Sequence, residues 1–373
     1  MNKNISKKVI CFLTSALVGG GVERVLIDTT HSLIEHFDIY IVSLYGEPDH
    51  TIANQFPKDV KIICAKLPPD KIKTTIPYMS KRHYEKIIQH INYDYLIVVN
   101  GAVYNAAFIK GAKNTIFWQH NDVITKYTNN RTSLKTLLAK LYFKVIYNKY
   151  NCIWTVCDKI SDDYRKAFGC KKVETISNPI KCDQILALAQ KDCAIKFDKS
   201  KTNIVMVGRY VEEKGFDRVI NIMSNKSIMN AENVHLYIVG EGSCRKNYES
   251  MINDHELSDM VTLVGFDWNP YSYVSQADLF VCPSHLESFG LVIMEAMLLR
   301  IPVITTATTG GTYTTQNGKY AWCVHSDEEL ANALALFVDN KDHYHWSLED
   351  AQHWVKQHDI TAFSQKLYKC LQE

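Results

Sequence analysis

The first half of the chain alternates between short apolar runs and amphipathic stretches. Apolar residues recur at the helical period in Val22–His36 and Tyr84–His90, which separate runs with the length of strands. The predicted strands are Val9–Thr14, Phe37–Leu44, Val60–Cys64, Tyr93–Val99, Thr115–Trp118 and Cys152–Val156. Strands that alternate with helices form βαβ units, so this half predicts an α/β domain with a parallel sheet.

The alternation stops at a polar stretch and then begins again. It breaks near Ser177-Asn178-Pro179-Ile180 and resumes after Lys201, which places a domain boundary at about 178–200. The strands predicted beyond it are Ile204–Val207, Val234–Val239, Val261–Val264, Leu279–Cys282 and Val303–Thr305. The tail, Leu348–Glu373, has the pattern of one or two helices.

The chain therefore divides into three expected parts. We expect an N-terminal Rossmann-like domain over residues 1–178 and a second Rossmann-like domain over residues 179–350. A helical segment over residues 351–373 is long enough to cross back to the first domain.

Composition is that of a folded protein with room for two cores. Of 373 residues, 46% are apolar and 22% are charged, which excludes a largely disordered chain. The 11 cysteines include no Cys-x-x-Cys pair, and their spacing does not match a zinc site. Free thiols are typical of a reducing compartment, so we expect a cytoplasmic protein.

The N-terminus has two interpretations. Three lysines among the first eight residues precede the apolar run Val9–Val18, which resembles a secretory signal. The run leads into Gly19-Gly20-Gly21 and an amphipathic stretch, and we therefore favour a first strand after a short basic tail. No segment approaches the roughly 18 apolar residues that a membrane-spanning helix needs.

Charge is unevenly distributed although the net charge is only +2. Residues 1–178 hold 25 Lys and Arg against 15 Asp and Glu, a balance of +10, which leaves −8 for the rest. A basic half favours an anionic partner. The alternative, which explains the +10 and −8 balances equally well, is that the imbalance arose by drift in a lysine-rich chain and has no functional partner.

Residues 126–149 carry an apolar stripe at helical spacing among cations. The stripe consists of Leu134, Leu137, Leu138, Leu141 and Val145. The cations are Lys126, Arg131, Lys135, Lys140, Lys144 and Lys149. A basic amphipathic helix can lie on an anionic membrane surface. The more common alternative is a solvated helix packed on the sheet, and the sequence leaves both open.

The first strand of the second domain is followed by two cations. Gly208 ends this strand, and Arg209 and Lys214 come after it at the carboxyl edge of a parallel sheet, where open α/β folds bind ligands. Arginine can bind a phosphate through two hydrogen bonds, and lysine adds a mobile charge. The two cations would stabilise a diphosphate leaving group as negative charge develops on it. Alone, the pair is weak, because such residues also occur in solvated loops.

Glycines mark the next two strand ends. Gly240-Glu241-Gly242 follows one strand and forms a turn suited to a nucleotide, although such turns are common. The following strand ends in Gly265 and Phe266. Main-chain groups at this position could contact the edge of a base, and Phe266 would line the base pocket.

The segment Pro283–Met297 carries the most informative pattern. Glu287 lies in a loop, and Gly290 and Leu291 open a helix whose free N–H groups suit a phosphate. Glu295 lies about one turn further along. A carboxylate accepts two hydrogen bonds at once, as a pair of vicinal sugar hydroxyls requires. The alternative for either glutamate is an exposed surface carboxylate.

The first domain contributes a glycine-rich turn and a histidine. Gly19-Gly20-Gly21 leads from the first strand into a helix, so its amides can approach a phosphate or an acceptor. The turn lacks the full Gly-x-Gly-x-x-Gly spacing and a later ribose-binding acid, which disfavours a dinucleotide site. His120 follows another strand and would face a cleft between the domains, where it could bind the sugar. A structural histidine is an equal alternative.

Together these residues resemble the retaining glycosyltransferases of family GT4, which have the GT-B fold. The matching motifs, in the family's order, are Gly20-Gly21-Val22-Glu23-Arg24-Val25, Ser177-Asn178-Pro179-Ile180, Gly208-Arg209, Lys214-Gly215, and the Glu-x7-Glu pattern from Glu287 to Glu295. The combination covers most of the chain and is specific, although no single motif is. The first motif resembles its form in enzymes that build bacterial surface polysaccharides. The resemblance implies two Rossmann-like domains whose parallel sheets face a central cleft.

The resemblance also implies roles around the donor sugar. Arg209 and Lys214 would hold the donor diphosphate. Glu287 would bind hydroxyls of the hexose, helped by the backbone N–H groups of Phe289 and Gly290. Gly208, Gly240, Gly265 and Phe266 would border the nucleotide.

Further roles concern the phosphates, the ribose and the acceptor. Leu291 and Val292 would offer amides to a phosphate, and Glu295 would bind the ribose hydroxyls. Gly20-Gly21 would border the phosphate and the acceptor, and His120 would touch the donor sugar.

The implied reaction is transfer of a hexose or N-acetylhexosamine from a nucleotide-diphosphate sugar, expected to be UDP-linked. The acceptor would be a glycan or glycolipid in bacterial surface polysaccharide or lipopolysaccharide synthesis, with the enzyme at the inner face of an anionic membrane. Such enzymes retain the anomeric configuration and usually need no metal or other cofactor, and the chain contains no Asp-x-Asp motif. A nucleic-acid partner is not expected.

One segment departs from the family pattern. After Gly310-Gly311 the family usually has a glutamate that begins a short helix, whereas this chain continues as Thr312-Tyr313-Thr314-Thr315-Gln316 and is shortened there. The departure puts the local loop and the donor preference in doubt.

Two other functions stay open. A sugar-nucleotide epimerase can share the two-domain architecture but would need acid and base groups around the sugar and no acceptor site. A non-catalytic subunit could bind a donor without transferring it. The presence of Arg209, Lys214, Glu287 and Glu295 together argues against a decayed site.

Overall fold

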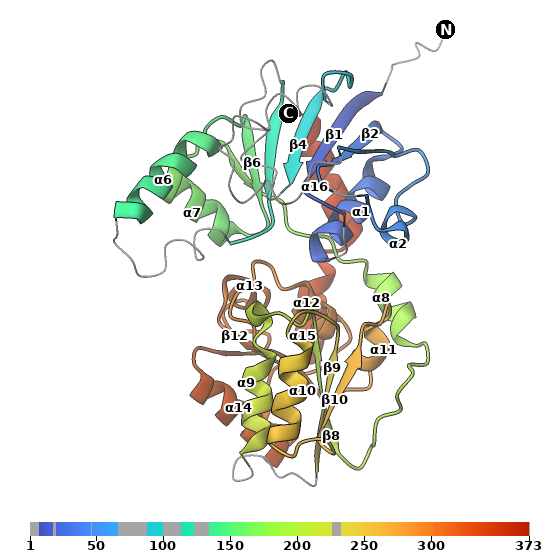
Figure 1. Ribbon diagram of the computed structural model, residues 1–373, viewed down its shortest axis with the longest axis vertical. Coiled ribbons are helices and arrows are strands. Elements are labelled where there is room, and N and C mark those ends of the chain that lie inside the picture. The colour runs from blue at the N-terminus through green and yellow to red at the C-terminus, as the bar shows by residue number, and fades with distance from the viewer. Residues whose placement is uncertain are drawn as a thin grey trace. The chain divides into compact units, whose positions relative to one another are not determined.

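The computed structural model describes residues 7–17, 20–45, 47–65, 88–99, 113–122, 134–225 and 233–372. It divides into two compact units, one made of Met1–Pro179 with Ile360–Glu373 and the other of Ile180–Asp359 (Figure 1). The segment predicted to begin at residue 351 is thus shared, because its part up to Asp359 lies in the second unit and the remainder in the first.

Within the described residues, the first unit is built on a sheet of seven parallel strands. They are β1 (Lys8–Thr14), β2 (Phe37–Ser43), β3 (Lys61–Cys64), β4 (Tyr95–Val99), β5 (Thr115–Gln119), β6 (Cys152–Thr155) and β7 (Val173–Thr175). Their order across the sheet is β3-β2-β1-β4-β5-β6-β7, so the direction of progress reverses between β1 and β4. The first six strands coincide with the apolar runs, whereas β7 has only three residues and was not predicted.

The helices of the first unit include the last one of the chain. They are α1 (Gly21–Leu33), α2 (His50–Ala53), α6 (Leu134–Tyr147), α7 (Asp158–Phe168) and α16 (Ile360–Gln372). Helix α16 packs against α1, and the hydroxyl of Tyr95 donates to the carbonyl of Leu371. Most of the helix predicted at Tyr84–His90 lies outside the described residues.

Helix α6 packs on the first unit through residues other than the predicted stripe. Phe143, Ile146 and Tyr147 are buried, whereas the predicted stripe is exposed at Leu137, Leu138, Leu141 and Val145. The helix is therefore packed on the first unit and solvated on its other side, as the packed-helix alternative states, but the predicted stripe is not the face that packs. The side chain of Leu134 and residues 126–133 lie outside what the structure describes.

The described part of the second unit is built on six parallel strands. They are β8 (Thr202–Val207), β9 (Val234–Val239), β10 (Val261–Gly265), β11 (Leu279–Cys282), β12 (Val303–Thr306) and β13 (Trp322–Val324). Their order is β10-β9-β8-β11-β12-β13, so progress reverses between β8 and β11. At such a switch point the loops after the two central strands diverge, which leaves room for a ligand at the carboxyl edge.

Helices cover the second sheet in two groups. The helical segments are α8 (Cys182–Ala189), η3 (Glu212–Lys214), α9 (Phe216–Ser224), α10 (Arg245–Asp254), α11 (Tyr271–Val274), α12 (Leu291–Leu298), α13 (Thr309–Thr314), α14 (Asp327–Asp339), η4 (Lys341–His343) and α15 (Leu348–Lys356). Helix α9 packs against α10 and α14, and α12 packs against α8, α11 and α15 (Figure 1). Because both faces are covered, β9, β11 and β12 are almost wholly buried, and β9 and β11 are almost wholly apolar.

The cysteines and the helices bear on two further expectations. All eleven cysteines lie in the described ranges, and all are free thiols, with Cys11 and Cys282 buried. Among the described residues, no helix combines the length and the apolar character needed to cross a bilayer.

Candidate functional site

The loop after β8 holds Lys214 at the carboxyl edge of the second sheet. Gly215, with a φ of 62°, ends the short η3 turn, and a Cβ there would lie 2.5 Å from the carbonyl oxygen of Pro283. Only glycine fits this turn without displacing the loop after β11. The aliphatic part of Lys214 lies over Gly208, where an added Cβ would be 3.6 Å from its Cδ. The turn and the underlying glycine thus fix the path of the lysine side chain.

Lys214 and Glu287 form an ion pair between the loops after β8 and β11. Lys214 Nζ lies 2.6 Å from Glu287 Oε2, and the side chains are 20% and 16% exposed. Burial is the largest single influence on the pKa of Lys214 and lowers it. The charge and the hydrogen bond of Glu287, together with the charge of Cys282, raise the pKa by more, so the pKa of Lys214 is raised overall. Lys214 is therefore a partly buried cation that the carboxylate of Glu287 holds in place at the carboxyl edge of the sheet.

Arg209 adds a second cation to this edge. Its side chain is exposed and makes no hydrogen bond or ion pair with any described residue. Its charge is close enough to lower the pKa of Lys214, although other groups outweigh it. Two cations in one loop at this edge suit a diphosphate.

The amino end of α12 brings backbone donors to the same edge. Gly290 has a φ of 82° and precedes the helix, and its carbonyl accepts from the amides of Ile293 and Met294. The amides of Leu291 and Val292 belong to the first turn, where a helix supplies no acceptor. They carry the positive end of the helix dipole, as the sequence predicted for a phosphate.

The segment that differs from the family pattern, Gly310–Gln316, supports the loop that carries Glu287. The amide of Gly310 donates to the carbonyl of Glu287 over 2.6 Å, and a Cβ at residue 310 would lie 2.7 Å from the backbone nitrogen of Phe289. Thr308 caps α13 by accepting from the amide of Gly311 over 3.0 Å. A short helix therefore forms without the family's glutamate, and Gly310 is required by close backbone packing.

Glu295 lies one turn into α12, and a tyrosine orients it. The hydroxyl of Tyr271 donates to Glu295 Oε1 over 3.1 Å. Tyr271 is buried in α11, while Glu295 is half-buried. Sequence analysis did not identify Tyr271, because nothing in the sequence links residues 271 and 295 before the sheet is folded.

The glycines after β9 are explained by packing. A Cβ at Gly240 would lie 1.8 Å from the carbonyl oxygen of Gly208, and one at Gly242 would lie 2.5 Å from that of Tyr210. These glycines let the loop after β9 pack directly on the loop after β8. Their contribution to a nucleotide site would be to hold Arg209 and its neighbours in place.

The end of β10 presents two exposed aromatic rings. Gly265 has a φ of 90°, which favours glycine. Phe266 and Trp268 are 60% and 59% exposed and meet edge to face, with ring centroids 4.8 Å apart. Phe266 stays a prediction for the base pocket, and Trp268 is a second aromatic surface that sequence analysis did not single out.

The first unit places the glycine turn at the amino end of α1. Gly21 begins the helix and Gly20 precedes it, and both are exposed. Among the described residues, a Cβ at Gly20 would meet only the flexible end of Glu23, at 3.0 Å from Oε2. Unlike Gly240, Gly20 is not required by packing, so open space at this turn is consistent with a ligand role.

His120 is buried in the first unit. Burial lowers its pKa to about 3, despite a hydrogen bond with the side chain of Asn178. Its ring lies 4.6 Å from that of Trp118. The imidazole is therefore neutral at physiological pH and can act as a hydrogen-bonding group but not as a cation. Contact between His120 and the donor sugar stays a prediction.

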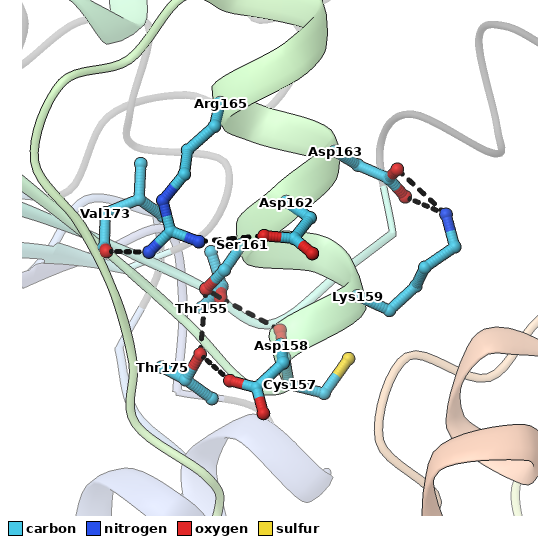
Figure 2. Close-up of polar contacts among 10 residues, drawn as sticks. All are labelled: Thr155, Cys157, Asp158, Lys159, Ser161, Asp162, Asp163, Arg165, Val173 and Thr175. Carbon is cyan, nitrogen blue, oxygen red and sulfur yellow. Dashed lines mark hydrogen bonds and ion pairs between the residues drawn. The ribbon is translucent and has the colours of Figure 1, made fainter.

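A chain of hydroxyls links the carboxyl ends of β6 and β7 (Figure 2). Ser161 Oγ lies 2.6 Å from Thr155 Oγ1 and 2.9 Å from Thr175 Oγ1. Thr175 in turn donates to Asp158 Oδ1 over 2.5 Å. The carboxylate of Asp158 is thereby fixed at the carboxyl edge of the first sheet, a feature that sequence analysis missed because its partners come from three separate segments.

Comparison with known proteins places the chain in a family. A family model described as "Glycosyltransferase Family 4" matches residues 19–184, and one described as "Glycosyl transferases group 1" matches residues 190–361. An uncharacterised glycosyltransferase of Haemophilus influenzae is 25% identical over 91% of this chain and 92% of its own length.

Two further proteins are similar over most of the chain. The N-acetylgalactosamine-N,N'-diacetylbacillosaminyl-diphospho-undecaprenol 4-alpha-N-acetylgalactosaminyltransferase of Campylobacter jejuni is 25% identical over 78% of each chain. The crystal structure of Anabaena Alr3699/HepE with UDP and glucose superposes with a TM-score of 0.75 at 17% identity, over 98% of this chain and 99% of that one.

The comparisons and the fold agree on the class of protein. Two Rossmann-like halves with parallel sheets match the GT-B fold, so the fold predicted from the sequence is confirmed, and both family models describe glycosyltransferases. The two family models together match most of the chain in the order of its halves. The chain is a GT4-like glycosyltransferase.

Proposed function

We propose that this glycosyltransferase moves a hexose or N-acetylhexosamine from a UDP-sugar to a glycan acceptor in bacterial surface polysaccharide or lipopolysaccharide synthesis, with retention of configuration. The observation that carries the proposal is the ion pair of Lys214 and Glu287 beside Arg209 and the amino end of α12. This arrangement offers cations and amides for a diphosphate together with a carboxylate for sugar hydroxyls.

The donor would be bound by charge on one side and hydroxyl recognition on the other. Arg209 and Lys214 bind the diphosphate, and the amides of Leu291 and Val292 bind its second phosphate. Glu287 accepts hydrogen bonds from the hexose. Because Glu287 also holds Lys214, the sugar and the cation are positioned by one carboxylate.

Catalysis follows from where charge develops. As the bond between the anomeric carbon and the phosphate oxygen breaks, negative charge grows on the departing diphosphate. Lys214 is fully protonated because its pKa is raised, so it stabilises this charge more in the transition state than in the ground state. The acceptor hydroxyl attacks the same face, and its proton passes to the departing phosphate oxygen. No metal is needed in this scheme.

The nucleoside would occupy the neighbouring loops. Glu295, oriented by Tyr271, accepts hydrogen bonds from the two ribose hydroxyls. The base lies against the exposed ring of Phe266, after β10. Stacking on an aromatic ring binds any base, so the preference for uracil would come from main-chain groups near Gly265.

The acceptor class is proposed from a relative and from the mechanism. The Campylobacter jejuni protein acts, by its name, on a diphospho-undecaprenol-linked sugar and makes an α linkage. Retention gives an α linkage when the donor is α-linked. We therefore favour a lipid-linked glycan acceptor, which would bring a cytoplasmic enzyme to the inner face of the membrane.

Product analysis tests the proposal. The full chain is incubated with UDP-glucose, UDP-N-acetylglucosamine or UDP-N-acetylgalactosamine and with lipid-linked mono- and disaccharides, with and without EDTA. We expect a product heavier by one sugar, an α linkage by NMR, and no loss of rate in EDTA. Conversion of the donor alone to its epimer would support the epimerase instead. Donor binding without any product would support a non-catalytic subunit.

A further inference from the structure

Helix α6 exposes a row of large apolar side chains. Within the described residues, Leu137, Leu138, Leu141, Tyr142 and Val145 are 42–57% exposed, and we call them the α6 apolar face. Of the other described residues, only Phe266, Trp268 and Leu336 are large, apolar and comparably exposed. Isolated exposed leucines are ordinary, but five large apolar side chains within residues 137–145 of one helix indicate a binding surface.

The exposure does not come from a helix that has separated from its domain. The opposite face of α6 is buried through Phe143, Ile146 and Tyr147. The ring of Tyr147 stacks on Phe117 with centroids 5.5 Å apart, and α6 lies along α7 (Figure 1). The helix therefore has two apolar faces, and only one of them is used by the core of the first unit.

Cations border the α6 apolar face. At 100° per residue, Lys140 and Lys144 lie on one side of the row formed by Leu137, Leu141 and Val145. Both lysines are exposed, and they are four residues apart, a like-charge spacing that is unfavourable in water. Lysines in this position can extend their charged ends to lipid phosphates while their stems cover apolar surface.

The surrounding sequence contains no opposing charge. No Asp or Glu occurs between Asp122 and Asp158, whereas the same stretch contains six Lys and Arg residues. A protein partner would have to supply both an apolar groove and a dense acidic rim. An anionic bilayer supplies an apolar interior beneath a layer of phosphates over any area, so it fits the surface without special shape.

We propose that α6 docks this protein on anionic membranes, with the α6 apolar face inserted at the boundary between headgroups and acyl chains. Lys140 and Lys144 contact the lipid phosphates, and the ring of Tyr142 lies at the interface. The biological role of this docking rests on the proposed function, because a lipid-linked acceptor lies in the membrane. Binding of the protein to vesicles requires neither donor nor acceptor. Failure of docking and failure of glycosyl transfer can therefore be distinguished.

Co-sedimentation of the full chain with vesicles tests docking. Wild type should bind phosphatidylcholine vesicles that contain phosphatidylglycerol and bind pure phosphatidylcholine vesicles at least tenfold more weakly. The double variant Leu137→Gln/Leu141→Gln should lose at least tenfold in partitioning to the anionic vesicles. Leu336→Gln is the matched control, because Leu336 is 43% exposed on α14 of the second unit, and it should bind like wild type.

The charged rim is tested separately. Lys140→Gln/Lys144→Gln should weaken binding to anionic vesicles by about 25-fold, since each juxtamembrane cation contributes about fivefold at physiological salt. Lys196→Gln/Lys199→Gln removes two exposed lysines of the second unit and should have no effect. Equal binding by the α6 lysine variant and wild type, or equal binding to neutral and anionic vesicles, would contradict the role of charge.

Two measurements separate the membrane from other occupants. Tyr142→Trp should add fluorescence that brominated lipids quench beyond the wild-type tryptophan signal. Sedimentation velocity should show the same mass for wild type and Leu137→Gln/Leu141→Gln. A wild-type dimer that the variant cannot form would assign α6 to a second copy of the chain and overturn the proposal, as would normal vesicle binding by that variant. Circular dichroism establishes that each variant is folded.

Discussion

The carboxyl edges of the two sheets are built from different chemistry. At the second sheet, Lys214, Glu287 and Arg209 place charge in loops that glycines force close together. At the first sheet, the groups described are a chain of hydroxyls that ends at Asp158 and a neutral, buried His120. One edge can stabilise a developing anion, and the other offers hydrogen bonds to uncharged hydroxyls.

This difference matches the two partners of a glycosyl transfer. The donor leaves with a diphosphate, whose charge must be stabilised, whereas the acceptor contributes a hydroxyl, which must only be positioned. The comparison predicts that substitutions at the second edge affect turnover and stability most strongly, and that those at the first edge act through weaker forces.

Removal of the Lys214 ammonium should have the largest effect. Lys214→Ala leaves Glu287 without its cation and the developing diphosphate charge uncompensated, so we expect kcat to fall on the order of a thousandfold. Lys341→Ala is the control, because it also breaks a lysine–carboxylate ion pair. Lys341 Nζ lies 2.7 Å from Asp278 Oδ1, and the Lys341 side chain is exposed. Steady-state kinetics measure kcat for both variants. A fall in kcat of less than about tenfold for Lys214→Ala would contradict the catalytic role of Lys214.

The glycines at the two edges should differ in what they affect. A methyl group at Gly240 would overlap the backbone of Gly208, so Gly240→Ala should lower the free energy of unfolding of the second unit by about 3 kcal/mol. Gly20→Ala meets only Glu23 and should cost less than about 1 kcal/mol while reducing transfer. Thermal unfolding and activity are compared for both variants. Equal shifts in Tm would mean that Gly20 is also a packing position.

The positions of the two carboxyl edges could largely be predicted from the sequence, because buried parallel strands consist of continuous apolar runs. Eleven of the thirteen described strands begin and end close to predicted runs, and the carboxyl-edge loops then follow from chain direction alone. The strand β13, Trp322–Val324, was missed along with β7, because three residues do not establish a period.

What could not be predicted depends on partners that meet only in the folded chain. The contacts of Tyr271 with Glu295 and of Gly240 with Gly208 join separate loops. The orientation of α6 was ambiguous for another reason. Phe143 and Tyr147 give the helix a second apolar face, and a hydrophobic pattern does not indicate which of two faces the sheet will bury.

The neutral state of His120 should make the stability of the first unit depend on pH. Its pKa is about 3 when folded and 6.5 when exposed, so the unfolded chain binds a proton that the folded chain does not. Stability from this group is complete above pH 6.5 and declines as the pH falls toward 3, by about 2 kcal/mol at pH 5.

The variant His120→Gln keeps a neutral hydrogen-bonding side chain and lacks this titration. Tm should therefore fall less steeply between pH 6.5 and 5 for the variant than for wild type, whatever its value at neutral pH. The pH dependence of Tm is measured for both proteins. Parallel curves would show that His120 can be protonated without cost, and the imidazole could then also serve as a cation at the first edge.

The smallest effect is expected where an uncharged hydroxyl orients a charged group. Tyr271→Phe removes the hydrogen bond to Glu295 Oε1, worth about 1 kcal/mol, so KM for the donor should rise about fivefold with kcat nearly constant. Glu295→Gln should give a larger rise, and Tyr271→Phe should add little to it, because the hydroxyl acts through that carboxylate. Additive effects of the two changes would mean that Tyr271 contacts the donor directly, and the second edge would then use a neutral hydroxyl as the first edge does.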